Sequence, residues 1–74
     1  MSVNEVHSKL AIERLRSVMQ RTGLGRSRIY ELMDAGEFPS SVPLGGRSKG
    51  WVSGEIDSWI RGRIAERDKE LAAA

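Results

Sequence analysis

Residues 17 to 36 read SVMQRTGLGRSRIYELMDAG, and this stretch decides the fold. We expect Ser17 to cap a short helix that runs from about residue 16 or 17 to residue 21 and turns Val18 and Met19 inward. Gly23 follows this helix, and glycine readily adopts the positive φ that a tight turn between helices requires. The first half of the stretch therefore predicts a short helix that ends in a glycine turn.

The second half of the stretch predicts another helix, over about residues 25–35. Its apolar residues form one stripe at helical period, namely Leu24, Ile29, Leu32 and Met33. Gly36 is suited to the position just after a helix end. Two helices joined by a short glycine-containing turn form a helix-turn-helix unit.

A β-hairpin and a third helix are expected further along the chain. Residues 42–44 and 50–52 suit strands, and the glycine-containing loop between them predicts a hairpin. Ser53 is expected to cap the third helix, in which Ile56, Trp59, Ile60 and Ile64 form an apolar stripe. We expect the charged run to remain helical to about residue 70.

The segment before the first helix is less regular. Leu10, Ile12 and Leu15 make a partly alternating apolar pattern, which suits either an entry strand or an extended lead-in. The expected fold class is mainly α with a small β-hairpin, a winged helix-turn-helix. We expect residues 1–9 to form a flexible tail, residues 10–70 the winged helix-turn-helix domain and residues 71–74 a frayed C-terminus.

Composition excludes several classes of protein. A chain of 74 residues holds one small domain. With no Cys and one His, it offers no disulfide, no thiolate zinc site and no His-rich metal site, so we expect no cofactor and no metal. Its longest uncharged stretch is nine residues, far short of the roughly 20 that a membrane helix needs. The first nine residues carry no apolar run, so we expect no secretory signal and a cytoplasmic, nucleoid-associated protein.

Basic charge is concentrated in two places, although the net charge is only +2. Five arginines lie in a window without acids, at positions 14, 16, 21, 26 and 28. Arg47 and Lys49 stand between two glycines at the predicted hairpin tip. Local basic charge of this kind is typical of a phosphate-binding face. The two clusters fall on the start of the second helix and on the wing, which are the parts of a winged helix that meet DNA.

Two separated blocks of sequence carry a family resemblance. The first runs Val18-Met19-Gln20-Arg21-Thr22-Gly23-Leu24, then Arg26-Ser27, Ile29-Tyr30, Met33, Gly36 and Phe38-Pro39. The second comprises Val42, Leu44-Gly45-Gly46-Arg47, Gly50-Trp51, Glu55-Ile56 and Trp59-Ile60. Together they resemble the AlpA family of small prophage regulators over about residues 15–67. The resemblance implies a small winged helix related to the MerR-type domain and to phage excisionases, and sequence-specific DNA binding in phages and integrated elements.

The chain departs from this family pattern at two positions. Gly25 stands where the family usually has a Ser that caps the second helix, which costs only a few tenths of a kcal/mol but removes a hydroxyl. Arg28 stands where a small polar residue is common. Its bidentate donor on the exposed face suggests that this protein reads a different base from its relatives.

The expected DNA contacts come from both basic clusters. We expect Arg26 and Arg28 to divide guanine and phosphate contacts between them, and Arg47 and Lys49 to reach the backbone or minor groove. The complete predicted set is Arg16, Arg21, Gly25, Arg26, Ser27, Arg28, Tyr30, Arg47, Ser48 and Lys49. Solvated surface charge is the alternative for each cation, and structural packing is the alternative for Tyr30.

Other residues are not expected to act on a ligand. Trp51 and Trp59 lie on a predicted strand and on an apolar stripe, so we expect them in the core rather than as stacking platforms. His7 lies in the tail without a partner. Glu55 and Asp57 are two apart on a helix and point in different directions, so no carboxylate pair, and no catalytic residue, is expected.

We therefore predict a sequence-specific DNA-binding protein of a phage or integrated element, acting as an AlpA-type transcriptional regulator, an excisionase or both. Expected partners are double-stranded DNA and either integrase or RNA polymerase. The chain is expected to be a monomer in solution that assembles cooperatively on DNA. The alternative is a winged-helix module that binds a regulatory protein, in which case charge reversal at Arg61 or Arg63 would abolish its activity.

Overall fold

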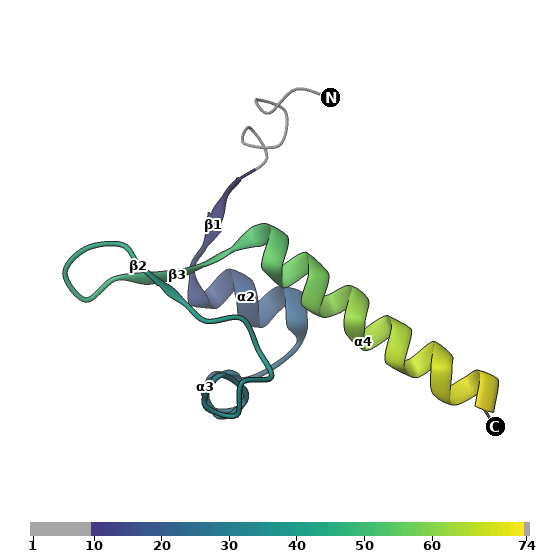
Figure 1. The fold of residues 1–74 in the computed structure, drawn as a ribbon. Helices are drawn as coiled ribbons and strands as arrows, with labels where there is room; N and C mark the ends of the chain where they lie inside the picture. The colour runs from purple at the N-terminus through teal and green to yellow at the C-terminus, as the bar shows by residue number, and fades with distance from the viewer. Residues whose placement is uncertain (1–9, 74) are drawn as a thin grey trace.

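The computed structural model describes residues 10–73, which form a helix-turn-helix unit, a small sheet and a long C-terminal helix (Figure 1). The expected tail of residues 1–9, which includes His7, lies outside the described residues. The elements in chain order are β1 (Ile12–Glu13), α2 (Leu15–Thr22), α3 (Arg26–Asp34), β2 (Val42–Pro43), β3 (Lys49–Val52) and α4 (Ser53–Ala73). The fold is thus mainly helical with a small antiparallel sheet, an arrangement compatible with a winged helix.

The turn between α2 and α3 confirms the prediction made from Gly23. This glycine has φ 74°, and its N–H donates to the carbonyl of Met19 at 2.9 Å, which ends α2. The predicted cap by Ser17 is wrong, because α2 already begins at Leu15. Ser17 lies inside the helix, and its hydroxyl donates to the carboxylate of Glu13 at 2.6 Å.

The end of α3 also follows the prediction. Gly36 has φ 73° and its N–H donates to the carbonyl of Met33 at 3.0 Å. The N–H of Glu37 donates to the carbonyl of Leu32 at 2.8 Å. This pair of bonds is a Schellman motif, and it directs the chain away from the helix toward the sheet.

The sheet has three strands rather than the two of a simple hairpin. Its order is β1-β3-β2, and both pairings are antiparallel. The lead-in before the first helix is therefore an entry strand, which pairs Ile12 with Val52 and Glu13 with Trp51. Gly50 lies at the centre, where a Cβ would come within 2.3 Å of the Ile12 side chain and 3.0 Å of the Glu13 carbonyl oxygen. Only glycine lets the neighbouring strand approach so closely.

The core lies between the helix-turn-helix unit, the sheet and the start of α4. Its fully buried members are Val18, Ile29, Trp51 and Ile56, and Phe38 is 6% exposed. The prediction that the tryptophans are structural is confirmed for Trp51, and half-buried Trp59 packs against the same cluster. The indole N–H groups of Trp51 and Trp59 donate to the carbonyls of Pro39 and Glu37, at 3.1 and 2.9 Å. Both bonds fix the segment that connects α3 to the sheet.

Helix α4 extends well beyond this core (Figure 1). Ile56 is buried, but Ile64 is 45% exposed, so the predicted apolar stripe is covered only in its first half. All residues from 61 to 73 are exposed. The helix continues to Ala73, whereas the sequence led us to expect fraying from residue 71. Within residues 10–73, no helix combines the length and the apolar character needed to cross a membrane.

Candidate nucleic-acid interface

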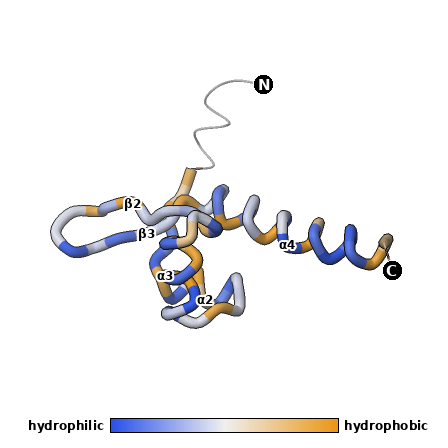
Figure 2. Tube along the Cα trace, turned by 60° about the horizontal axis from the view of Figure 1, so that its bottom comes forward, coloured by the Kyte–Doolittle hydropathy of each residue, from blue (hydrophilic) through white to orange (hydrophobic). Residues whose placement is uncertain are grey.

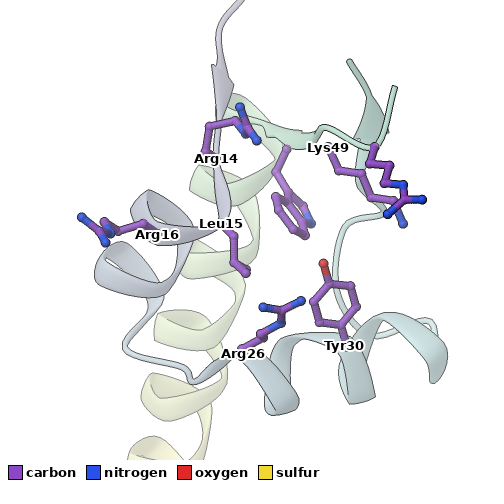
Figure 3. Close-up of a pocket in the computed structure, with 8 residues that line it drawn as sticks. Arg14, Leu15, Arg16, Arg26, Tyr30 and Lys49 are labelled. Carbon is purple, nitrogen blue, oxygen red and sulfur yellow. The ribbon is translucent and has the colours of Figure 1, made fainter. Parts of the chain in front are cut away.

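A cationic hollow lies where the start of α2, the start of α3 and strand β3 meet (Figure 3). Its volume is about 430 Å³. We call it the basic hollow, and its lining residues are Arg14, Leu15, Arg16, Arg26, Tyr30, Arg47, Lys49 and Trp51. Five of these carry a positive charge and none is acidic. The surface is therefore suited to a polyanion.

The local backbone geometry of each element explains how it places its residues around the basic hollow. Arg14 has an extended backbone at the N-terminus of α2, and Arg16 lies in the first turn of that helix. Arg26 and Tyr30 are four residues apart on α3, so they share one face of the helix. Lys49 and Trp51 alternate along β3 and so point to the same side of the sheet. The loop between β2 and β3 supplies Arg47, and the limb of this loop that leads into β3 is hydrophilic (Figure 2).

The side chains converge to different degrees. Arg26 and Tyr30 reach into the hollow from α3. Arg14, at the start of α2, and Lys49, on β3, border it, and Arg16 points away from its centre (Figure 3). The guanidinium carbon of Arg26 lies 5.9 Å from the centre of the Tyr30 ring, within range of a cation–π contact. This contact positions the Arg26 charge at the start of α3.

The floor of the hollow is aromatic. The rings of Tyr30 and Trp51 meet edge to face, with centroids 6.5 Å apart and an angle of 70°. Trp51 is only 1% exposed, so it supports the hollow without offering a face for stacking. Tyr30 is half-buried and its ring packs against the core cluster, but it also lines the basic hollow, so its contact with DNA stays a prediction.

Several predicted residues lie outside the basic hollow. Arg28 follows Arg26 by two residues on α3 and so lies on the side of the helix away from the basic hollow. Its side chain is 61% exposed. It lies 3.5 Å from the Glu31 carboxylate, a surface ion pair that stabilises little. Gly25 and Ser27 are exposed at the start of α3, with Gly25 as the extended N-cap residue. Ser48 is half-buried in the hairpin loop, where its carbonyl accepts from the N–H of Leu44 at 2.8 Å.

Arg21 differs from the other predicted cations because two carboxylates from different elements hold its guanidinium. Its guanidinium donates to the carboxylates of Glu13 on β1 and Asp57 on α4. The hydrogen bond to Asp57 is the main cause of a raised pKa for Arg21. Burial raises the pKa of Glu13, but hydrogen bonds from Ser17 and Ser53 and the nearby Arg21 charge outweigh it, so the pKa is lowered. Arg21 therefore ties β1 and α2 to α4, and it does not line the basic hollow.

Arg14 lines the basic hollow but is absent from the residues that we predicted to bind. The signal for it was present in the sequence, since Arg14 belongs to the same acid-free basic window as Arg16 and Arg26. Its place beside Lys49 and Trp51 depends on the pairing of β1 with β3, a long-range contact that the local sequence does not determine. No group of three or more His, Cys, Asp and Glu that could hold a metal occurs in the part of the chain that the structure describes.

The fold and the site define a small helix-turn-helix protein with a hairpin, whose cations gather where the second helix begins. The chain belongs to the AlpA family, since the family described as "Prophage CP4-57 regulatory protein (AlpA)" matches residues 4–64. It is 48% identical over 56 residues to the uncharacterized protein ORF88 of Enterobacteria phage P4. That match covers 76% of this chain and 64% of the phage protein, so the chain spans less than two thirds of that relative.

A second relative is the DNA-binding transcriptional activator AlpA of Escherichia coli strain K12. It is 37% identical over 62 residues, a match that covers 76% of this chain and 89% of the relative. The family resemblance inferred from the two sequence blocks is thereby confirmed.

Proposed function

We propose that this chain is a sequence-specific DNA-binding regulator of a phage or integrated element, with a MerR-like winged-helix fold. The observation that carries the proposal is the basic hollow, in which five cations and no acid line a surface formed by α2, α3 and β3. Double-stranded DNA is a regular polyanion of matching charge. The relative from E. coli, a DNA-binding transcriptional activator, supports the same function.

In the proposed complex, α3 enters the major groove with its N-terminal residues foremost. Ser27 and Arg28 are exposed at this end and are the proposed base-reading residues. Arg26 is proposed to bind phosphate, because its guanidinium lies in the basic hollow with Arg14 and Lys49. Arg21 is not retained as a DNA contact, because Glu13 and Asp57 already occupy its guanidinium.

The hairpin is proposed to act as the wing. Arg47 is exposed in the loop between β2 and β3, and Lys49 begins β3 on the side of the basic hollow. Cations on a projecting loop reach the sugar–phosphate backbone or the adjacent minor groove, and they read shape more than base identity. This arrangement separates affinity, supplied by the wing, from specificity, supplied by α3.

The proposed role is transcriptional regulation, excision or both, because each requires the same DNA-binding face. A transcriptional activator would act on RNA polymerase, whereas an excisionase would bend DNA and contact integrase. One chain presents one α3 and one hairpin, so a single copy covers a short site. We propose a monomer that assembles cooperatively on neighbouring sites.

The experiment that tests the proposal is selection of bound fragments from the host genome at near-physiological salt, followed by sequencing. Enrichment of one promoter site would support an activator, and enrichment of tandem copies of a short motif would support an excisionase. A chain that enriches no fragment, and whose binding to any duplex is insensitive to salt, would refute DNA binding. That result would favour a protein-binding module instead.

A further inference from the structure

Helix α3 has a hollow on each of its two flanks. Arg26 and Tyr30 line the basic hollow on one flank. Leu24, Arg28 and Leu32 line a second hollow on the other flank, between α3 and α4. The exposed residues Ser27, Glu31 and Asp34 lie between the two flanks. This division follows from helical geometry, since residues two apart, such as Arg26 and Arg28, point in nearly opposite directions.

The second hollow has a volume of about 370 Å³ and contains two arginines from different helices. Arg28 comes from α3 and Arg63 from α4, and Trp59 and Glu37 complete the lining. The wall is held in place by Trp59, whose indole N–H donates to the carbonyl of Glu37 at 2.9 Å and whose ring packs on Phe38 with centroids 4.9 Å apart. Arg63 follows Trp59 by four residues on α4, so it lies next to this fixed wall, although Arg63 itself is exposed.

We propose that Arg63 binds a backbone phosphate of the second DNA strand. This inference rests on the proposed function, and it assigns α4 a part in DNA binding in addition to its role in the core. The chemical class of the ligand is a phosphodiester. Arg28, which lines the same hollow from α3 and has a side chain that is 61% exposed, remains the proposed base-reading residue.

The dimensions of DNA support the assignment. The major groove is about 12 Å wide, and an α-helix with its side chains is about 10–12 Å across. A helix in this groove therefore has one phosphate backbone on each side, and the two backbones belong to different strands. The basic hollow faces the first backbone, so the hollow with Arg63 faces the second.

The charges of the second hollow are suited to a single phosphate. Arg28 and Arg63 are its two cations, and Glu37 is the one acid among the lining residues. In the described part of the chain, the side chain of Arg28 has a long ion pair with Glu31, and no ion pair is formed between the carboxylate of Glu37 and Arg63. The guanidinium of Arg63 is thus available for an anion, whereas Glu37 weakens the attraction.

The test measures binding of the full chain to the duplex enriched in the genomic selection. Arg63→Ala is expected to weaken binding roughly fivefold near 0.15 M salt, equally for all sequences, and to lower the salt slope by about 0.9. Arg63→Lys should remain within about twofold of the wild type because it keeps the charge. Arg61→Ala is the matched control, since Arg61 is exposed on the same helix but lines neither hollow.

A second measurement identifies the strand. In each duplex, one phosphate is replaced by a neutral methylphosphonate, and the position of this replacement is moved along each strand in turn. Where the replaced phosphate is the one that Arg63 binds, Arg63→Ala should no longer weaken binding. Such positions should lie on one strand only. The positions at which Lys49→Ala no longer weakens binding should lie on the other strand. Glu37→Gln should strengthen binding about twofold, because it removes a negative charge near the phosphate.

The outcomes separate the inference from the proposed function. If the wild type binds and Arg63→Ala weakens binding no more than Arg61→Ala, the second phosphate site is wrong and the proposed function stands. Cancellation of the Arg63→Ala and Lys49→Ala effects on the same strand would also overturn it. If the wild type binds no duplex, the proposed function fails and the inference fails with it.

Discussion

The salt dependence of nonspecific DNA binding follows directly from the basic hollow. Each phosphate neutralised by a protein cation contributes about −0.9 to the slope of log affinity against log salt on B-form DNA. If all five lining cations bind phosphates, they contribute about −4.5 to the slope, which is a fall in affinity of about 500-fold between about 50 and 200 mM salt, and the phosphate proposed for Arg63 would add about −0.9. Nonspecific binding needs no known operator, so any duplex is suitable.

Single substitutions then test the structural assignment of each cation. Arg47→Ala should make the slope shallower by about 0.9, because it removes one exposed cation of the basic hollow. Arg21→Ala should leave the slope unchanged, because Arg21 is paired with Glu13 and Asp57. The two variants lose the same formal charge, so a difference between them reports position rather than net charge.

The assay is a fluorescence anisotropy titration of a labelled duplex at several salt concentrations. Far-UV circular dichroism of each variant verifies that it is folded. A wild-type slope shallower than about −2 would mean that two phosphates or fewer are bound, and the basic hollow would not be the DNA site. Equal slopes for Arg21→Ala and Arg47→Ala would likewise refute the argument from ion pairing.

Three further predictions concern specificity, packing and pH. Arg28→Ala should change the preferred sequence, with about 1–3 kcal/mol lost at one base pair, whereas Lys49→Ala should weaken all sites alike, as measured by competition among duplexes. Gly50→Ala should lower the free energy of unfolding by about 1–3 kcal/mol in urea titrations, because the added Cβ meets the Ile12 side chain; an unchanged midpoint would contradict this packing. The lowered pKa of Glu13 means that its ionised form stabilises the fold above the ordinary pKa of 4.5 and that this stabilisation is lost as the pH falls through the lower folded-state value. The Tm of Glu13→Gln should therefore be below that of the wild type at pH 7 and converge with it in acid, and a gap that is constant with pH would contradict the linkage.

The helix-turn-helix unit was predictable because its signals are local. Gly23 and Gly36 end their helices at positive φ, as the sequence indicated, and the apolar stripe of α3 places Ile29 in the core. The hairpin was also predictable from the residue types of its strands. These elements depend on residues within a few positions of one another.

The strand β1 and the start of α2 were harder to predict. The pattern around Ile12 was compatible with a strand or an extended segment, and pairing with β3, about 40 residues later, decided between them. Ser17 looked like a cap because serine favours that position, but its hydroxyl bonds to Glu13 of the adjacent strand instead. Long-range pairing thus overrode a local preference.

The sequence by itself determined which segments are helical, where glycine turns interrupt them, and that positive charge gathers at two places along the chain. Only the tertiary structure decided which of those charges face outward together. Arg21 and Arg26 look alike in the sequence, yet Arg21 is held by Asp57 of α4 while Arg26 lines the basic hollow. The reason is physical: turns and helices follow from the conformational preferences of neighbouring residues, whereas a side chain's partners depend on contacts that form only when distant segments pack together.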